Sequence, residues 1–342
     1  MRRYAVAAAA VALALIVAAC GEVRTPNAPT VPPLPQGGSA TLTQSAGPGA
    51  RARIVVVTHG QASDPFWAVV RRGVDDAARE QGISVTYEAP DIYDVARMHQ
   101  LIDTAVATHP AGLVVSLPDP EGLAPAIRKA VRDGIPVISI NSGSDSFRAL
   151  GILLHVGQPE YAAGLGAGKR MTAEGVRHPL CVIQEAGNVG LQERYRGFAH
   201  AIAEAGGSSR VLIVNLQNQA GAERAMAAAL RGGRTDGLLT MGAEIVTPAL
   251  EALKATGMQN TIPYATFASH SADVLRAVVA GKIQFAVDQQ PYLQGYLPIV
   301  LLAEYIRYGV LPAKGTLIPT GPVFVTKANA ARVLALTKRG IR

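Results

Sequence analysis

Cysteine is scarce in this chain of 342 residues, where Cys20 and Cys181 are the only two. They lie far apart, and Cys181 falls within a hydrophobic segment, so Cys20 has no evident disulfide partner. The formal net charge is +7, but no block of five like charges occurs, which gives nucleic-acid binding no support. Aromatic residues make up only 5% of the chain, so each aromatic residue in a loop is informative.

Catalytic and metal-binding patterns are also missing. There is no G-x-S-x-G motif and no arguable Ser-His-Asp set, so we expect no enzyme. None of the seven histidines has the i, i+4 spacing of a helical zinc site. We expect the loop histidines His59 and His270 to hydrogen-bond ligand or backbone, and we expect neither a metal nor a cofactor. The glycine-rich segment 164–169 lacks Walker spacing and is interpreted as small residues for close helix–sheet packing.

The N-terminus reads MRRYAVAAAAVALALIVAAC. A basic head, an uncharged apolar stretch and small residues before Cys20 describe a secretory signal, and the run is too short for a membrane span. The placement of Cys20 resembles a bacterial lipobox, which implies that residues 1–19 are removed and that Cys20 is acylated. The alternative is an ordinary signal peptide in which Cys20 is incidental. We therefore expect an extracytoplasmic protein that is lipid-anchored through Cys20.

The segment after Cys20 predicts a tether. Between Gly21 and Ala50 lie six prolines and five glycines with few large apolar residues. Such a segment cannot bury enough surface to offset its chain entropy, so residues 20–50 are interpreted as a semi-extended linker. The folded part then begins near Arg51, and its roughly 290 residues suggest two domains.

From Arg51 onward, short runs rich in Val, Ile and Leu alternate with amphipathic helical patterns, which predicts an α/β fold with parallel sheets. The expected strands are 54–57, 85–87, 113–116, 137–140, 180–183, 211–214, 237–240, 264–267 and 285–287. The expected helices are 66–80, 95–107, 123–132, 191–205, 220–231, 246–255 and 272–280.

The two halves of this pattern match each other in register. Arg72-Gly73-Val74 corresponds to Arg196-Gly197-Phe198, and Ile135-Pro136-Val137 corresponds to Ile262-Pro263-Tyr264. These matches indicate the internal duplication of a whole open sheet. Because such a sheet binds ligands beyond the carboxyl ends of its strands, two facing sheets predict a cleft between two lobes.

The loops expected at these strand ends combine aromatic, amide and guanidinium side chains. Trp67, Asn141, Arg194 and Gln289 all lie there or nearby. Aromatic faces cover the C–H side of a sugar ring, while amides and arginine form directed hydrogen bonds with its hydroxyls. This mixture favours a neutral polyhydroxyl ligand.

Six segments carry a more specific pattern: THGQASDPFW (58–67), GIPVISINSG (134–143), VGQPEYAAG (156–164), LQERYRGF (191–198), AVDQQPYLQGYLP (286–298) and TGPVFVT (320–326). Over Arg53 to about Ala330, the chain resembles ribose-type periplasmic sugar-binding proteins, the substrate receptors of ABC importers. The resemblance implies the type I periplasmic binding protein fold, two Rossmann-like parallel-sheet lobes joined by a three-strand hinge. It also implies delivery of a sugar or polyol to a membrane permease and its ATPase. The alternative is a sensory sugar-binding protein that presents its ligand to a membrane receptor or histidine kinase.

The resemblance further implies a set of ligand-binding positions. They are Asp64, Phe66, Trp67, Asn141, Arg194, Gly242, Ala268 and Gln289. Phe66 is the expected stacking residue, and Arg194 matches the arginine of the R-x-x-G-F pattern. Asn141 and Ala268 stand where aspartates are usual, which leaves Arg194 as the expected dominant polar anchor. Either the ligand is less hydroxylated than an aldopentose, or other side chains replace the lost carboxylates: Ser269, His270 or Asp288.

The expected lobe boundaries follow from three crossings of the chain, near Gly157, Asp288 and Thr316. The first lobe comprises 51–157 plus 289–315, and the second comprises 158–288 plus 316–342. We expect a monomer.

Overall fold

The structure, a computed structural model, describes residues 52–60, 64–269, 271–337 and 340–341. The predictions made for the signal peptide 1–19, for Cys20, for the tether 20–50 and for His270 lie outside these residues. None of the described helices is long and apolar enough to cross a membrane.

The first of two six-stranded sheets has the strand order β11-β5-β4-β3-β1-β2. All its strand pairs are parallel. Its strands are β1 (Arg53–Val57), β2 (Ser84–Glu88), β3 (Gly112–Ser116), β4 (Val137–Ile140), β5 (Leu154–Gly157) and β11 (Thr316–Pro319).

The second sheet has the order β12-β10-β9-β8-β6-β7, so each strand takes the place of its counterpart in the first sheet. Its strands are β6 (Pro179–Ile183), β7 (Arg210–Ile213), β8 (Gly237–Thr240), β9 (Tyr264–Thr266), β10 (Phe285–Asp288) and β12 (Val323–Thr326). Only β12 runs antiparallel to its neighbour, β10. The shared order confirms the predicted duplication and the predicted α/β architecture of two parallel-sheet lobes.

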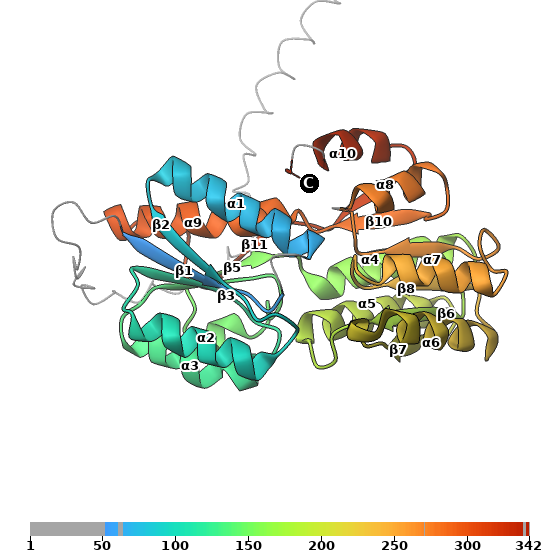
Figure 1. Cartoon of the computed structure of the whole chain (residues 1–342), viewed down its shortest axis with the longest axis horizontal. Helices are drawn as coiled ribbons and strands as arrows, with labels where there is room; N and C mark the ends of the chain where they lie inside the picture. Colours follow the sequence, from blue (N-terminus) through green and yellow to red (C-terminus); the bar gives the residue numbers. More distant parts are fainter. Residues whose placement is uncertain (1–51, 61–63, 270, 338–339, 342) are drawn as a thin grey trace, which may run out of the picture. The chain divides into compact units, whose positions relative to one another are not determined.

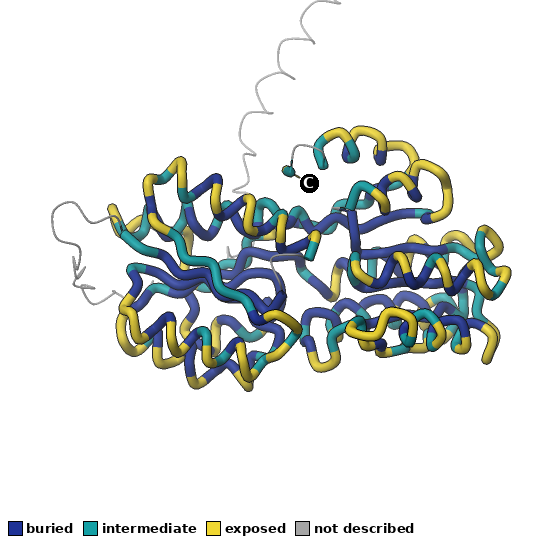
Figure 2. Tube along the Cα trace, viewed as in Figure 1, coloured by how far each residue is buried: buried dark blue, intermediate teal, exposed yellow. Residues whose placement is uncertain are grey.

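Helices cover both faces of the first sheet (Figure 1). Helices α1 (Pro65–Gln81) and α9 (Pro291–Tyr308) lie on one face, and α2 (Val95–Ala107) and α3 (Pro120–Arg132) lie on the other. Along β1, Ile54 and Val56 pack toward α1 and α9, whereas Val55 and Val57 pack toward α2 and α3. Burial on both faces explains why the strands read as continuous apolar runs. Figure 2 shows the central strands of this sheet as buried and the edge strand β2 as mainly intermediate, with exposed residues on the outer sides of the helices.

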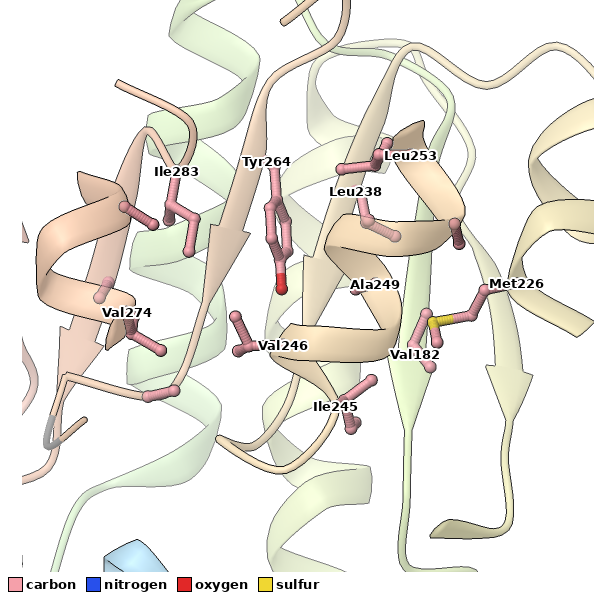
Figure 3. Close-up of a cluster of buried hydrophobic side chains, with 14 of the residues drawn as sticks. Val182, Met226, Leu238, Ile245, Val246, Ala249, Leu253, Tyr264, Val274 and Ile283 are labelled. Atoms are coloured by element: carbon pink, nitrogen blue, oxygen red, sulfur yellow. The ribbon is translucent and has the colours of Figure 1, made fainter. Parts of the chain in front are cut away.

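The second sheet is covered in the same way. Helices α4 (Glu160–Ala173) and α5 (Val189–Glu204) lie on one face, and the other face carries α6 (Gln219–Arg231), α7 (Val246–Ala255), α8 (Ala272–Val279) and α10 (Ala330–Thr337). In Figure 3, Leu238 and Tyr264 of this sheet lie among Val246, Ala249 and Leu253 of α7. Short 3-10 turns, η1 (Phe147–Leu150) and η2 (Leu216–Asn218), complete the elements. As expected, Cys181 lies in the core, buried in β6 with a free thiol.

Glycines allow the helices on one face of each sheet to approach closely. A Cβ at Gly164 of α4 would lie 1.8 Å from the Arg194 carbonyl oxygen of α5, and one at Gly197 of α5 would lie 2.0 Å from the Tyr161 carbonyl oxygen. Gly164 of the glycine-rich segment 164–169 thus packs α4 against α5, whereas a Cβ at Gly166 would meet Phe324 of β12, so the predicted helix–sheet packing accounts for only part of the segment. The same approach fixes the backbone of Arg194 relative to α4.

The first lobe repeats this arrangement between α1 and α9. A Cβ at Gly73 would lie 2.1 Å from the Tyr292 carbonyl oxygen, and one at Gly295 would lie 1.9 Å from the Val70 carbonyl oxygen. The duplicated Arg-Gly pair thus marks the same helix contact in both lobes.

The chain passes between the sheets three times, after β5, after β10 and after β11. The third crossing differs from the predicted one. Strand β11 pairs with β5 of the first sheet, with Thr316 opposite Leu154, so the chain crosses between Pro319 and Val323 rather than at Thr316. Both sheets end in a strand with a free edge, and local sequence does not encode which edge a short strand joins.

Candidate functional site

Two adjoining cavities lie at the carboxyl ends of the strands of both sheets. The inner cavity has a volume of about 50 Å³ and the outer cavity about 960 Å³. Residues of both lobes line each of them. We call the residues common to both cavities the neck: His59, Asp64, Gln184, Glu185, Ala243 and Glu244.

The inner cavity brings together most of the residues predicted to bind ligand. Seven of them line it: Asp64, Phe66, Trp67, Asn141, Arg194, Gly242 and Gln289. Ala268 is different, because it is fully buried in the hydrophobic core against α7 and α8. Its neighbour Phe267 lines the cavity, and successive residues of an extended chain point to opposite faces. The prediction that Ala268 lines the cleft is therefore wrong.

An aromatic wall stands at the start of α1. Asp64 caps this helix by accepting a 2.8 Å hydrogen bond from the Phe66 amide, and Pro65 occupies the first helical position. The rings of Phe66 and Trp67 meet edge to face, with centroids 5.0 Å apart. A Cβ at Gly60 would lie 1.8 Å from the Trp67 indole nitrogen, so glycine at position 60 leaves room for this ring. The Asp64 cap thus fixes the start of the helix that carries both rings, and Gly60 leaves the space that Trp67 occupies.

The guanidinium of Arg194 was predicted to be a polar anchor for the ligand, but it is already hydrogen-bonded within the protein. Its Nε donates to Glu160 Oε2 at 2.7 Å, its Nη2 donates to Glu160 Oε1 at 2.9 Å, and its Nη1 donates to the Met241 carbonyl at 2.7 Å. The guanidinium also lies 4.4 Å from the Phe267 ring centroid. Both charged side chains are only 3% exposed. Since a guanidinium has five N–H groups, two remain for a ligand.

Asn141 follows β4 in the left-handed conformation, with φ at 63°, which asparagine tolerates better than most residues. Its Nδ2 donates to Gln294 Oε1 at 3.3 Å. Gln294 in turn donates to the Gln289 carbonyl at 3.1 Å and to Thr320 Oγ1 at 3.2 Å. Sequence reasoning missed Gln294, although it lies within the AVDQQPYLQGYLP segment. It connects a cavity residue to two of the three crossings.

The loops that follow β1 and β6 touch across the cleft. His59 accepts or donates a 2.8 Å bond with Ser116 Oγ through Nδ1, and its Nε2 lies 3.4 Å from Asn188 Nδ2 and 3.6 Å from Glu185 Oε2. Ser142 of the first lobe donates to Asn188 Oδ1 at 3.0 Å. Asn188 is therefore the main polar bridge between the lobes. It lies in the loop after β6, one of the strand-end loops that the sequence predicted to line the cleft.

The neck is acidic. Burial, together with repulsion from Glu244 and Glu185, raises the pKa of Asp64 to about 8, against the opposing hydrogen bond from the Phe66 amide. Burial and the charge of Glu185 raise the pKa of Glu244. Burial also opposes ionisation of Glu185, but the charge and hydrogen bond of His59, with a bond from Asn188, lower its pKa overall. Crowding of these carboxylates therefore disfavours the ionised forms of Asp64 and Glu244.

The arrangement suits binding. An aromatic wall faces amide and guanidinium donors in a concave, partly apolar cavity, as in small-molecule sites generally. Across the described part of the chain, no group of three or more His, Cys, Asp or Glu side chains is arranged to hold a metal ion.

Comparison with known proteins places these features in a family. Residues 54–309 match the model of the periplasmic binding protein domain. A crystal structure of a carbohydrate transporter from Acidothermus cellulolyticus 11B, in complex with myo-inositol, is 36% identical, with a TM-score of 0.79. The match covers 86% of this chain and all of that one.

Two further matches are more distant. The xylose/arabinose-binding protein XylF of Sulfolobus acidocaldarius is 25% identical over 293 residues, covering 81% of this chain and 71% of that protein. A periplasmic sugar-binding protein of Legionella pneumophila has a TM-score of 0.73 at 22% identity, covering 79% of this chain and all of that one, and it shares the fold.

These matches confirm the predicted type I periplasmic binding protein fold with its two parallel-sheet lobes. They also place the protein among binding proteins rather than enzymes. The chain belongs to the periplasmic binding protein family.

Proposed function

We propose that this protein is the substrate-binding component of an ABC importer, which captures a sugar or related polyhydroxyl molecule and delivers it to a membrane permease and its ATPase. The observation that carries the proposal is the inner cavity, where Phe66 and Trp67 face Asn141, Gln289 and the remaining N–H groups of Arg194. Rings cover the apolar face of a sugar, and the polar groups define the directions of its hydroxyls.

The relatives support a carbohydrate ligand. The Acidothermus protein is a carbohydrate transporter with myo-inositol bound, and the Sulfolobus protein is named for xylose and arabinose. All three compounds carry several hydroxyl groups. We infer the same ligand class here.

A thermal-shift screen of the purified protein against pentoses, hexoses and cyclitols tests this function. A ligand at 100 times its dissociation constant stabilises the protein by about 2.7 kcal/mol. We expect at least one member of the panel to raise the melting temperature, and loss of the gene should abolish uptake of that compound. Absence of any shift across the panel, repeated by calorimetry, would contradict a carbohydrate-binding role.

We also propose that the protein works outside the cytoplasmic membrane as a lipoprotein. Residues 1–19 serve as the signal, Cys20 carries the lipid, and 20–50 form the tether. The first lobe is then 51–157 plus 289–319, and the second is 158–288 plus 320–342. The support is the basic, apolar and small-residue order that ends at Cys20.

Mass spectrometry of the membrane fraction tests the anchor. We expect a mature chain that begins at a lipid-modified Cys20, and we expect Cys20→Ala to release the protein from the membrane. A Cys181→Ala variant is the matched control and should stay membrane-bound. A Cys20→Ala protein that remains in the membrane fraction to the same extent would rule out the lipid anchor.

A further inference from the structure

The residues that line the cleft carry mostly negative charge, although the chain as a whole is positively charged. The formal net charge is +7, yet Arg194 is the only arginine or lysine among the described residues that line the two cavities. Glu160 neutralises it in a buried, bidentate ion pair. The lining carboxylates are Asp64, Glu185, Glu244 and Asp273, of which Asp273 pairs with Arg276 outside the cavity.

The three carboxylates of the neck lack a cationic partner from lysine or arginine. Among the described residues, no such side chain lies within salt-bridge distance of Asp64, Glu185 or Glu244. Glu185 lies 3.6 Å from His59 Nε2 and accepts a 2.6 Å hydrogen bond from Asn188 Nδ2. Asp64 comes from the first lobe, whereas Glu185 and Glu244 come from the second, so the carboxylates face one another across the cleft. Their mutual repulsion is relieved either by protonation or by a cation bound between them.

Buried amide oxygens without a hydrogen-bond donor line the same inner cavity as these carboxylates and provide a second, independent observation. Gln289 is only 6% exposed and lines the inner cavity, and its Oε1 has no hydrogen-bond partner. Gln184 Oε1 at the neck is buried without a partner too. A buried acceptor without a donor is costly, so these oxygens require a ligand that donates. Trp67 and Tyr93 add aromatic faces, which attract cations.

We propose that the ligand of this cleft is a polyhydroxyl ring that carries a protonated amine, that is, an amino sugar or an aminocyclitol. The inference rests on the proposed function, because it assigns the ring to the inner cavity against Phe66 and Trp67. The ammonium group then lies at the neck between Asp64, Glu185 and Glu244. An ammonium offers three donors and no acceptor. This matches the carboxylates of the neck and the unpaired oxygens of Gln184, at the neck, and of Gln289, in the inner cavity.

Calorimetric titration of the purified protein at pH 6.5 tests the proposal with matched ligands. The first set is glucosamine, glucose and N-acetylglucosamine, in which the acetyl group removes the charge but keeps the nitrogen. The second set is scyllo-inosamine and myo-inositol. We expect the amine of at least one set to bind about tenfold more tightly, or better, than its neutral counterparts.

The outcomes separate the two claims. If a neutral sugar or cyclitol binds and no amine binds more tightly, the assignment of a cationic ligand is wrong while the proposed function stands. If neither the amines nor their neutral counterparts bind, the assignment of a cationic ligand is wrong, and the thermal-shift screen of pentoses, hexoses and cyclitols decides the proposed function separately.

Glu244→Gln locates the charge that selects the amine. It keeps the size of the side chain and removes one carboxylate, so the ratio of amine to neutral affinity should fall about three- to tenfold. Asp64→Asn should lower the same ratio while an oxygen remains to cap the Phe66 amide. Glu251→Gln, on α7 outside both cavities, is the matched control and should leave the ratio unchanged. An unchanged ratio in both neck variants, with melting temperatures like the wild type, would overturn the proposal.

Discussion

The ion pair with Glu160 changes the role of Arg194 from the one that its motif predicted. A motif arginine in a sugar cleft suggests a free bidentate donor, but Glu160 occupies one edge of this guanidinium and the Met241 carbonyl another. Glu160 also accepts a 2.8 Å bond from Gln158, next to the first crossing. Arg194 therefore contributes to the fold of the second lobe as well as to the cavity.

Arg194→Met should lower the free energy of unfolding by about 3 kcal/mol, because it leaves a buried carboxylate without its partner. The double variant Glu160→Gln with Arg194→Met should recover more than half of that loss, while ligand affinity stays low. Chemical denaturation and calorimetry measure the two effects separately. If the double variant is as unstable as the single one, the ion pair does not account for the stability.

His155 makes the stability of the first lobe sensitive to acid. It is fully buried in β5, and its Nδ1 bonds Ser139 Oγ at 2.9 Å. Burial, aided by Arg148 and opposed by a backbone bond at Asn141, lowers the pKa of His155 to about 4. In the unfolded chain this imidazole takes up its proton near pH 6.5. Because the unfolded state binds more protons between these values, stability should fall as the pH drops from about 6.5 to about 4.

The expected loss from this one group is about 3 kcal/mol over that interval, with no further loss below it. His155→Gln should lack this component, so its unfolding free energy should depend less on pH. Denaturant titrations at several pH values between 4 and 7 give the comparison, with His178→Gln, a more exposed histidine, as the control. Identical pH dependence in the wild type and His155→Gln would contradict the prediction.

At the scale of elements, reciprocal glycines define the two tightest helix contacts. Gly164 and Gly197 join α4 to α5, and Gly73 and Gly295 join α1 to α9. In each pair, each glycine faces a carbonyl of the opposite helix. The contact places α5, and with it Arg194, at a fixed distance from Glu160 of α4. The duplicated Arg-Gly motif is therefore a packing motif.

Gly164→Ala should lower the free energy of unfolding by roughly 1–3 kcal/mol or more, because its Cβ would lie 1.8 Å from the Arg194 carbonyl oxygen and the helices would have to separate. Gly166→Ala on the same helix is the control. Its Cβ would come no closer than 3.1 Å, to the ring of Phe324, and alanine favours the helix by about 1 kcal/mol. Thermal melts should rank Gly164→Ala well below Gly166→Ala, and equal melts would contradict the packing argument.

At the scale of the whole molecule, three crossings held together by hydrogen bonds favour hinge motion. The Thr320 amide donates to the Gly157 carbonyl at 3.1 Å, and Gln290 Nε2 donates to the Thr320 carbonyl at 2.6 Å. These bonds connect all three crossings. Most other contacts stay within one lobe, so rotation about the crossings disturbs few of them.

We predict that ligand shifts the protein toward a closed state. Small-angle scattering should show the radius of gyration falling on addition of a saturating ligand identified by the thermal-shift screen. Asn188→Ala removes the polar bridge to Ser142 and should reduce this fall, because the closed state loses a contact between the lobes. An unchanged radius at saturation would argue against closure.

The alternation of strands and helices, and most of the cavity residues, could be predicted from the amino-acid sequence. Successive residues of a strand point to opposite faces of the sheet, and helices cover both faces here. Strands such as β3 are therefore apolar along almost their whole length, and this local signal is enough to predict alternating strands and helices. Ligand residues lie at or near strand ends, so the sequence predicts that Asn141 and Arg194 line the cavity. Strands β5, β11 and β12 and helix α10 were not predicted, because they are short and carry no strong period.

The partners of particular strands and side chains could not be predicted in this way. Strand β11 joined β5 rather than the second sheet, Ala268 turned into the core because Phe267 took the cavity side, and Glu160 engaged Arg194. Each of these outcomes depends on groups more than thirty residues away or on the face that a strand presents. Periodicity and motifs describe neighbours along the chain. Which strand pairs with a free sheet edge, which group neutralises a buried charge and which side chain fills the core depend on the groups that come close in the folded molecule.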